Sequence, residues 1–295
     1  MDAPEIFVIL GAGVIGLTTA LELAARYQHA AIHVAAKFLP GETSIEYTSP
    51  WAGANFSPVA KNAREENWDT VTYRRFTRLA EDAPESGVQK MELRALFDMP
   101  IEESGIFSPE QGKIWYEELV GGFRGIANED LPEGAVWGHD WDSFIVNVPV
   151  YLSWLRNEAE KIGVHFHRRF FEGLDELYAA FPQARAFFNC TGLGSISLKG
   201  GQVMLIESPM MQLTRSYERA NKDESILTYV YPRNPAGGVI IGGCRLDHNW
   251  EEEADLQAAE AIKRRCCELA PELGQPGDLK VLQHIVGLRR KNCNF

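Results

Sequence analysis

Three glycines near the amino end of the chain have the spacing that places backbone against a diphosphate. Gly11, Gly13 and Gly16 stand between an apolar run at 6–10 and an amphipathic run at 17–28. In such a strand–turn–helix the first glycine permits a tight turn, the second lets the backbone approach the pyrophosphate, and the third lets the helix pack on the strand. The positive amino end of the helix then faces the phosphates. The sequence therefore predicts a dinucleotide cofactor; a tight loop without a ligand is the alternative.

The segment after this helix completes a βαβ unit but lacks the acid that a nicotinamide site would use. Residues 31–36 are predicted to form a second strand, and Lys37 follows them. NAD-binding folds hold the ribose hydroxyls with a carboxylate near the end of that strand. Ala36 stands there instead, which argues against an NAD-linked dehydrogenase but leaves dinucleotide binding intact. Lys37 is either a contact to phosphate or ribose or an ordinary surface lysine.

A second glycine turn follows another predicted strand. Residues 184–189 form that strand, and Cys190, Thr191 and Gly192 come directly after it. Such a turn can bring backbone against a ligand. Two glycine turns separated by mixed sequence indicate a cofactor domain interrupted by a second domain, and cofactor clefts commonly form where two such domains meet.

The remaining patterns predict an α/β chain with a Rossmann-like domain, marked by the GxGxxG turn, and a second α+β domain with a mixed or antiparallel sheet. Proline in the first turn and acids near the start support two of the helices. The predicted helices cover 64–94, 149–162 and 251–269. The further predicted strands are 106–107, 135–137, 143–148, 164–171, 204–207, 226–231, 239–243 and 279–288, with a hairpin turn at 234–238.

Composition narrows the class of ligand. The 295 residues include 41 acidic and 29 basic side chains, a net charge of −12, which disfavours nucleic acid and anionic membrane partners. The five cysteines are odd in number and contain no C-x-x-C pair, so we expect neither a disulfide framework nor a metal site. The apolar run at 6–25 contains three glycines and Glu22, so we expect no membrane span. A small-molecule ligand is the expectation.

Several segments together resemble the fungal D-amino-acid oxidases. They are the turn 11–16, the run 43–56 (TSIEYTSPWAGANF), the turn 189–194 (NCTGLG), the strand 229–233 (YVYPR) with glycines at 242–243, and 286–289 (VGLR). The resemblance covers nearly the whole chain, and SPWAGAN within the second segment is its most specific part. It implies an FAD-binding domain over 1–60, 141–200 and 286–295, and a substrate-binding domain over 61–140 and 201–285.

The resemblance implies FAD as the cofactor, and a D-amino acid and oxygen as the substrates. The amino acid would become an imino acid that hydrolyses to a 2-oxo acid and ammonia, while oxygen becomes hydrogen peroxide. Arg289 would clamp the substrate carboxylate and Tyr229 would hydrogen-bond to it. Ala12 to Ile15 would contact the diphosphate, Lys37 the adenosine side and the Phe171 backbone the adenine, while Ser44, Ala52, Gly53 and Asn55 would contact the ribityl chain and flavin. The implied cofactor residues are Gly11, Ala12, Gly13, Val14, Ile15, Gly16, Lys37, Ser44, Ala52, Gly53, Asn55, Phe171, Thr191 and Gly192.

The chain departs from the family pattern in two places. Gly194 reaches Gly201 in seven steps, where family members carry a longer segment. The sequence also stops at Phe295, where the family continues with a strand, a glycine-rich flavin motif and a peroxisomal Ser-Lys-Leu ending. We therefore expect weak or absent flavin retention, and a non-catalytic family member is one alternative.

Substrate, assembly and compartment are open at this point. D-Aspartate oxidase is the close alternative within the family, and it requires a second cation near the substrate side chain. We keep a homodimer as an open assembly state. The family implies the peroxisome, and the cytoplasm is the expectation if the ending is real.

Overall fold

The computed structural model describes residues 4–192, 198–209, 212–223, 226–235, 237–244, 246–247 and 253–290. The chain divides into two compact units, each assembled from separate stretches. Unit 1 comprises Met1–Ala52, Val148–Lys199 and Gly287–Phe295, and unit 2 comprises Gly53–Asn147 and Gly200–Val286. The units place 53–60 and 141–147 with unit 2, whereas the predicted FAD-binding domain includes these residues. The assignment of cofactor and substrate to separate domains stays a prediction.

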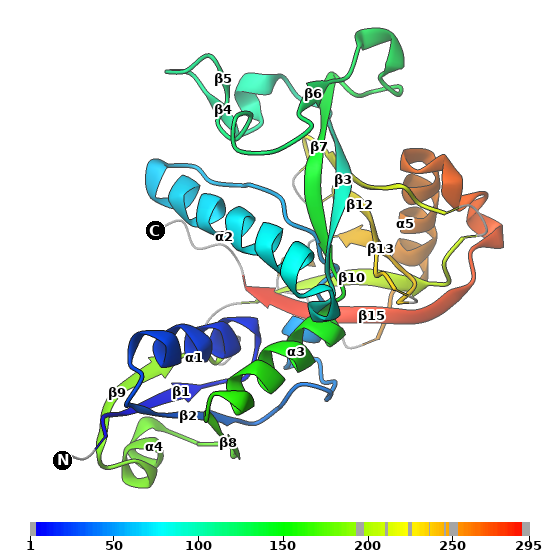
Figure 1. Cartoon of the computed structure of the whole chain (residues 1–295). Helices are drawn as coiled ribbons and strands as arrows, with labels where there is room; N and C mark the ends of the chain where they lie inside the picture. The colour runs from blue at the N-terminus through cyan, green and yellow to red at the C-terminus, as the bar shows by residue number, and fades with distance from the viewer. Residues whose placement is uncertain are drawn as a thin grey trace. The chain divides into compact units, whose positions relative to one another are not determined.

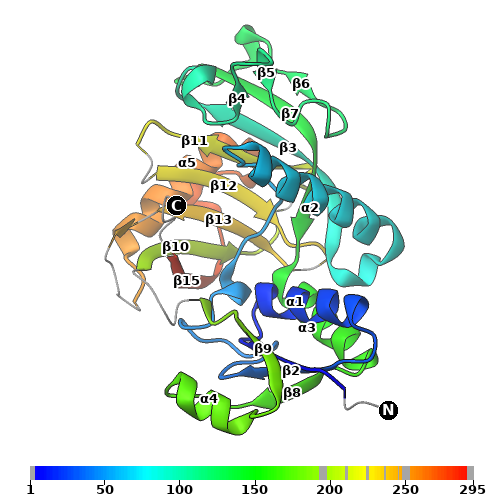
Figure 2. The same ribbon diagram turned by 90° about the vertical axis from the view of Figure 1, so that its left-hand side faces the viewer.

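Unit 1 is built on a parallel sheet of four strands. The order is β8-β2-β1-β9 (Figure 1), and β2 pairs in parallel with β1 and β8 while β9 pairs with the other side of β1. Helices α1 and α3 lie on one face of this sheet and α4 on the other, as both views show (Figures 1 and 2). The strands are β1 (Ile6–Leu10), β2 (Ala31–Ala36), β8 (His165–Arg168) and β9 (Ala184–Asn189), and the helices are α1 (Val14–Arg26), α3 (Val148–Lys161) and α4 (Leu174–Ala180).

Apolar periodicity explains these positions. The middle of β1 is buried, as a parallel strand covered on both faces requires. Helix α1 buries Leu17 and Ala20, one turn apart on the same face, and α3 buries Leu152 and Leu155. The helices therefore cover the sheet with their apolar sides. The glycine turns follow the carboxyl ends of β1 and β9, which are neighbouring parallel strands.

Unit 2 is built on a nine-stranded sheet. Its order is β14-β10-β13-β12-β11-β3-β7-β6, and β15 pairs with β10. The β11–β3 pair is parallel, whereas β10–β13, β11–β12, β12–β13, β3–β7 and β6–β7 are antiparallel, so the sheet is mixed, as the sequence predicts. The strands are β3 (Val88–Phe97), β6 (Arg124–Gly125), β7 (Trp137–Val146), β10 (Leu198–Ile206), β11 (Arg215–Ala220), β12 (Ile226–Pro232), β13 (Val239–Cys244), β14 (Leu246–Asp247) and β15 (Val281–Arg290), beside the small hairpin of β4 (Phe107–Ser108) and β5 (Lys113–Ile114).

Two helices lie on opposite sides of this sheet (Figures 1 and 2). Helix α5 (Leu256–Leu269) packs Ile262 and Cys266 against Val230 and Ile241 in one buried cluster. Helix α2 (Ala63–Asp82) places aromatic rings against Phe144 on the other side. The short 3-10 helices are η1 (Ser49–Trp51), η2 (Pro84–Ser86), η3 (Ile101–Glu103), η4 (Asn128–Asp130), η6 (Pro271–Leu273) and η7 (Pro276–Asp278). In the described part of the chain, no helix has the length and apolar character to cross a membrane.

The predicted helix over 64–94 is wrong in its second half. Helix α2 ends at Asp82, and Gly87 takes a left-handed φ of 77° that turns the chain into β3. Residues 88–94 then pair with β7 and β11, so sheet pairing overrides their helical spacing. The separate strands predicted over 135–137 and 143–148 overlap the two ends of one strand, β7, with which β3 pairs over its whole length, and Val148 already belongs to α3. Strand β11 and helix α4 were not predicted.

The other boundaries differ by smaller amounts. The strands over 31–36, 184–189, 226–231 and 239–243 are confirmed, and β8 is shorter than the predicted 164–171. The helix predicted over 251–269 begins at Leu256, because the Asp255 side chain caps it by accepting from the backbone of Gln257 and Ala258. Residues 251–252 lie outside the described residues, as does residue 236 of the hairpin turn.

Candidate functional site

The glycine turn forms where three parallel strands of unit 1 end. Gly11 N donates to Ala35 O at the end of β2 (2.8 Å), and Cys190 N donates to Leu10 O (2.8 Å). Gly11 has φ 110°, and a side chain on it would overlap the carbonyl oxygen of Cys190. A Cβ on Gly16 would likewise overlap the Gly11 carbonyl. The tight turn and the close packing of α1 therefore both require glycine.

The amino end of α1 presents unpaired N–H groups. The first backbone hydrogen bond of the helix runs from Leu17 N to Gly13 O (3.0 Å). The N–H groups that precede Leu17 therefore have no partner within the helix. Val14 N donates to the Ser49 hydroxyl (3.1 Å), while Ile15 N and Gly16 N have no acceptor among the described residues. The first turn contains no acidic side chain. This end of the helix can therefore receive an anion.

The segment before Gly53 supports the turn with two side chains that the sequence did not single out. Tyr47 donates its buried hydroxyl to Ala12 O (2.7 Å), and burial raises the Tyr47 pKa well above its ordinary value. Ser49 contacts the turn from η1. Ser44 accepts from the Trp51 indole through its carbonyl oxygen (2.7 Å), and Ala52 is exposed. Tyr47 and Ser49 both lie inside the run 43–56 that carries the family resemblance, so the resemblance could have indicated them.

Lys37 and Phe171 lie at the ends of neighbouring strands. Strands β2 and β8 pair in parallel up to Ala36 and Arg168, so the residues that follow them meet at one edge. Lys37 forms an exposed ion pair with Glu46, and its ammonium lies 5.4 Å from the centre of the Phe170 ring. The Arg169 guanidinium stacks 4.6 Å from the Phe171 ring. Aromatic and cationic side chains therefore lie together at these strand ends. That Lys37 and Phe171 contact the adenosine part of the cofactor remains a prediction.

Thr191 and Gly192 continue from the end of β9. Thr191 N and its hydroxyl both donate to Asn189 Oδ1, at 3.2 and 2.7 Å, which holds the turn beside Gly11. Gly192 has a left-handed φ of 63°. The rest of this glycine turn, including Gly194, lies outside the described residues. Within unit 1 the structure therefore brings the glycine turn 11–16 and Thr191 together.

In unit 2, Tyr229 and Tyr231 stand on one face of β12. Their rings stack with centroids 4.6 Å apart and an angle of 13°. Val230 between them packs toward α5, so alternation places both tyrosines on the opposite face. The Tyr229 ring lies against the backbone of Gly242, where a Cβ would come 2.7 Å from the hydroxyl. The two glycines of β13 thus leave room for the ring.

Asn55 joins this face through a chain of hydrogen bonds. Asn55 Nδ2 donates to the Ser57 hydroxyl (3.0 Å), and Ser57 Oγ donates to Glu218 Oε1 (2.7 Å). The Tyr231 hydroxyl donates to the same oxygen. We call the set Asn55, Ser57, Glu218, Tyr229 and Tyr231 the tyrosine face. The sequence predicted Asn55 and Tyr229 but missed Glu218, because strand β11 itself was not predicted.

Arg233 anchors the backbone at Gly53. Its Nε donates to Gly53 O (2.8 Å), and its side chain is buried, which lowers the Arg233 pKa to about 10. Gly53 also lies against the Tyr231 ring, since a Cβ there would come 2.6 Å from Cδ2. Arg233 therefore positions one predicted cofactor residue. It stood within the quoted YVYPR strand, but nothing in the sequence indicated its partner.

Arg289, the predicted clamp for the substrate carboxylate, lies in strand β15. Its side chain is outside the described residues, so its role stays a prediction. The same holds for the segment 291–295, on which the expectation of a shortened ending rests.

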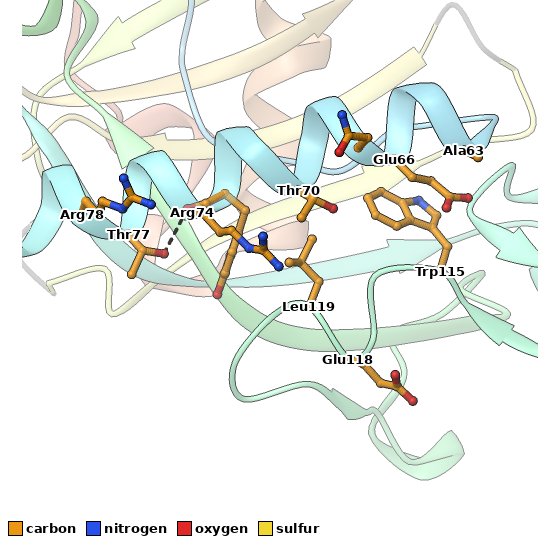
Figure 3. Close-up of a pocket in the computed structure, with 11 residues that line it drawn as sticks. Ala63, Glu66, Thr70, Arg74, Thr77, Arg78, Trp115, Glu118 and Leu119 are labelled. Carbon is orange, nitrogen blue, oxygen red and sulfur yellow. Dashed lines mark hydrogen bonds between the residues drawn. The ribbon is translucent and has the colours of Figure 1, made fainter.

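A separate groove of about 720 Å³ runs along α2 (Figure 3). Thr70, Arg74 and Arg78 line it from the helix, and Trp115 and Leu119 line it from the facing loop. None of the predicted site residues lines this groove. In the described ranges, no group of three or more His, Cys, Asp or Glu side chains is arranged to hold a metal ion.

The chain is similar to known proteins in sequence and in fold. Residues 7–294 match the family model described as FAD dependent oxidoreductase. A D-amino-acid oxidase of Schizosaccharomyces pombe is 36% identical over 98% of this chain and 84% of its own length, and a D-aspartate oxidase of Talaromyces thermophilus is 30% identical over 97% and 83%. The crystal structure of glycine oxidase from Geobacillus kaustophilus has a TM-score of 0.70 and 16% identity, over 96% of this chain and 82% of that one. The last of these supports the fold alone.

Proposed function

Since the chain belongs to the FAD dependent oxidoreductase family, we propose that it catalyses the FAD-dependent oxidation of D-amino acids to 2-oxo acids, ammonia and hydrogen peroxide. The observation that carries the proposal is the open amino end of α1. There the Ile15 and Gly16 N–H groups have no acceptor among the described residues, in a turn that requires glycine at positions 11 and 16. That is the arrangement a diphosphate needs.

The residues present fit the cofactor. In unit 1, the backbone of Gly11 to Gly16 would hold the diphosphate, and Lys37 with Phe171 would contact the adenosine side. Thr191, Gly192, Ser44 and Ala52 belong to the same unit. In unit 2, Gly53 and Asn55 would contact the flavin side. When bound, FAD supplies the acceptor for the hydride from the substrate α-carbon and passes the electrons to oxygen.

The chain itself supplies orientation and electrostatics. Arg289 would pair with the substrate carboxylate, since a guanidinium matches a carboxylate with two parallel hydrogen bonds. The Tyr229 hydroxyl would donate to the same carboxylate from a ring that Tyr231 and Gly242 hold in place. A substrate fixed at its carboxylate and side chain presents one face of its α-carbon, so one enantiomer reacts.

D-Aspartate oxidation is the second candidate because one similar protein is a D-aspartate oxidase. It requires a cation that faces the substrate side chain. The tyrosine face presents the Glu218 carboxylate instead, and the Arg233 Nε is directed to Gly53 O. The geometry therefore favours D-amino acids without an acidic side chain. A homodimer, and location in the peroxisome or cytoplasm, stay proposals that rest on the family.

The test is a spectrum followed by an assay. The purified full chain is mixed with FAD, excess FAD is removed, and the retained flavin absorbance is measured before and after anaerobic addition of D-alanine or L-alanine. We expect retained flavin that is bleached by D-alanine alone, and peroxide release when air is admitted. Retained flavin that neither enantiomer bleaches would support the non-catalytic alternative. Absence of retained flavin would contradict the proposed cofactor site and bear out the expected weak retention.

A further inference from the structure

Glu218 is a half-buried residue of the tyrosine face, and one of its two carboxylate oxygens accepts hydrogen bonds. Ser57 and Tyr231 both donate to Oε1, and among the described residues no donor reaches Oε2. No Lys, Arg or His in the described part of the chain forms an ion pair with Glu218, although the sheet carries ion pairs such as Arg94–Asp140 nearby. The unpaired Oε2 is not among the buried polar atoms of the described residues that lack a partner, so it is open to solvent and can accept hydrogen bonds from a cationic group.

Its position relates it to the proposed substrate contact. Glu218 on β11 pairs directly with Tyr229 on β12, and residues paired this way project to the same face with Cβ atoms about 5 Å apart. The Tyr231 ring stacks on the Tyr229 ring, and its hydroxyl reaches Glu218. Glu218 therefore lies on the same face of the sheet as the Tyr229 hydroxyl that is proposed to hold the substrate carboxylate.

The surface between the two groups suits a long side chain that ends in a cation. The stacked rings of Tyr229 and Tyr231 lie on this face, and aromatic rings pack well against a methylene chain and attract a cation at the ring face. The end of the surface is a carboxylate oxygen with no internal donor. A neutral aliphatic side chain would leave that oxygen unpaired, and an acidic one would be repelled by it.

We propose that Glu218 selects D-amino acids with a basic side chain, such as D-lysine, D-ornithine and D-arginine. The side-chain ammonium or guanidinium donates to Glu218 Oε2 while the methylenes lie along the two tyrosine rings. This inference rests on the proposed function for the identity of the reaction, and it adds the class of substrate.

The experiment compares D-lysine with D-norleucine, which has the same carbon chain without the ammonium. In the wild-type holoenzyme we expect kcat/KM for D-lysine to exceed that for D-norleucine by about tenfold or more, as a charge-assisted hydrogen bond provides. Glu218→Gln keeps the acceptor for Ser57 and Tyr231 but removes the charge, and it should lower the ratio of kcat/KM for D-lysine to kcat/KM for D-norleucine to about one. The matched control is Glu207→Gln, an exposed glutamate of unit 2 paired with Lys280, which should keep the preference.

A second readout does not depend on turnover. Calorimetry compares 6-aminohexanoate with hexanoate, which differ only in the terminal ammonium. We expect tighter binding of 6-aminohexanoate to the wild type and equal binding of the two by Glu218→Gln. Equal binding to the wild type, or a preference that survives Glu218→Gln, would overturn the inference. If the wild type oxidises no D-amino acid, the proposed function fails, and the calorimetric pair still decides whether Glu218 receives a cation.

Discussion

The glycine turn of unit 1 and the tyrosine face of unit 2 both join segments that lie far apart in the sequence, but they use different atoms. The turn is made of backbone: strand ends, N–H groups and glycines whose missing Cβ atoms make room. The tyrosine face is made of side chains that project from β11, β12 and the segment after Gly53. The turn should therefore be sensitive to any added carbon, whereas the face should be sensitive to the loss of single polar groups.

Gly16→Ala should produce the largest effect, because the new Cβ would overlap the backbone of Gly11. Neither partner is a flexible side chain, so α1 must shift away from β1. We expect a loss of about 3 kcal/mol in the free energy of unfolding, measured by urea denaturation, together with loss of FAD binding. Gly125→Ala is the control, since a Cβ there meets open space. Unchanged FAD affinity in Gly16→Ala would contradict the backbone account of the turn.

Acid should weaken unit 2 through His139. This side chain is 1% exposed, and burial lowers its pKa to about 4. Because the folded pKa lies below the unfolded value of 6.5, the unfolded state binds the proton first. The stabilisation is therefore complete above pH 6.5 and is lost as pH falls toward 4. The loss is about 2 kcal/mol at pH 5 relative to pH 8.

Urea denaturation of His139→Asn at both pH values tests this. The variant should show a weaker pH dependence than the wild type, and the exposed His29→Asn should not. In unit 1, burial and repulsion from His167 and His165 lower the pKa of His33, and burial with repulsion from His165 lowers the pKa of His167, so both groups act in the same direction as His139. If the free energy of unfolding of His139→Asn depends on pH as strongly as that of the wild type, His139 is not the source of the acid sensitivity.

Arg233→Met tests a residue of unit 2 that positions the backbone at Gly53. The change leaves the half-buried Gly53 carbonyl without the Nε donor, and the loss of a hydrogen bond from a charged group costs about 1.5–3 kcal/mol. We expect a loss of about 1.5 kcal/mol in unfolding free energy, with a rise in the FAD dissociation constant. The exposed Arg264→Met on α5 is the control. An unfolding free energy equal to that of the wild type would contradict a role for Arg233 in anchoring Gly53.

Tyr229→Phe should have the smallest effect on the protein and a selective effect on the reaction. The ring keeps its stacking and its place against Gly242, so the free energy of FAD binding should stay within about 0.5 kcal/mol of the wild type. Loss of one hydrogen bond to a charged group should lower kcat/KM about tenfold. Steady-state kinetics with D-alanine measures this, and Tyr178→Phe, on the exposed surface of α4, is the control.

The same contrast explains what could be predicted from the sequence. The turn was predictable because backbone geometry imposes glycine at fixed spacing between a strand and a helix. Gly11 and Gly16 therefore identified the turn, and the family resemblance added the run that contains Ser49. Sheet pairing was harder, because residues 88–94 have helical spacing and only their partners in β7 and β11 make them a strand.

Glu218 could not have been found in this way. Its interest comes from Ser57 and Tyr231, which lie 161 and 13 residues away in the chain and meet it only in the folded sheet. Arg233 is a similar case, since its partner Gly53 is 180 residues away. A single glutamate or arginine in a strand carries no spacing rule, so such partners appear only once the register of β11 and β12 is known.

The most direct test measures both regions in one series. FAD is titrated into the wild type, Gly16→Ala and Tyr229→Phe, and each loaded protein then receives D-alanine without oxygen while flavin absorbance is followed. Gly16→Ala should lose FAD affinity, whereas Tyr229→Phe should bind FAD as the wild type does but be bleached about tenfold more slowly at low substrate concentration. Normal FAD affinity in Gly16→Ala, or a Tyr229→Phe protein that is bleached at the wild-type rate, would contradict the division of tasks between the glycine turn and the tyrosine face.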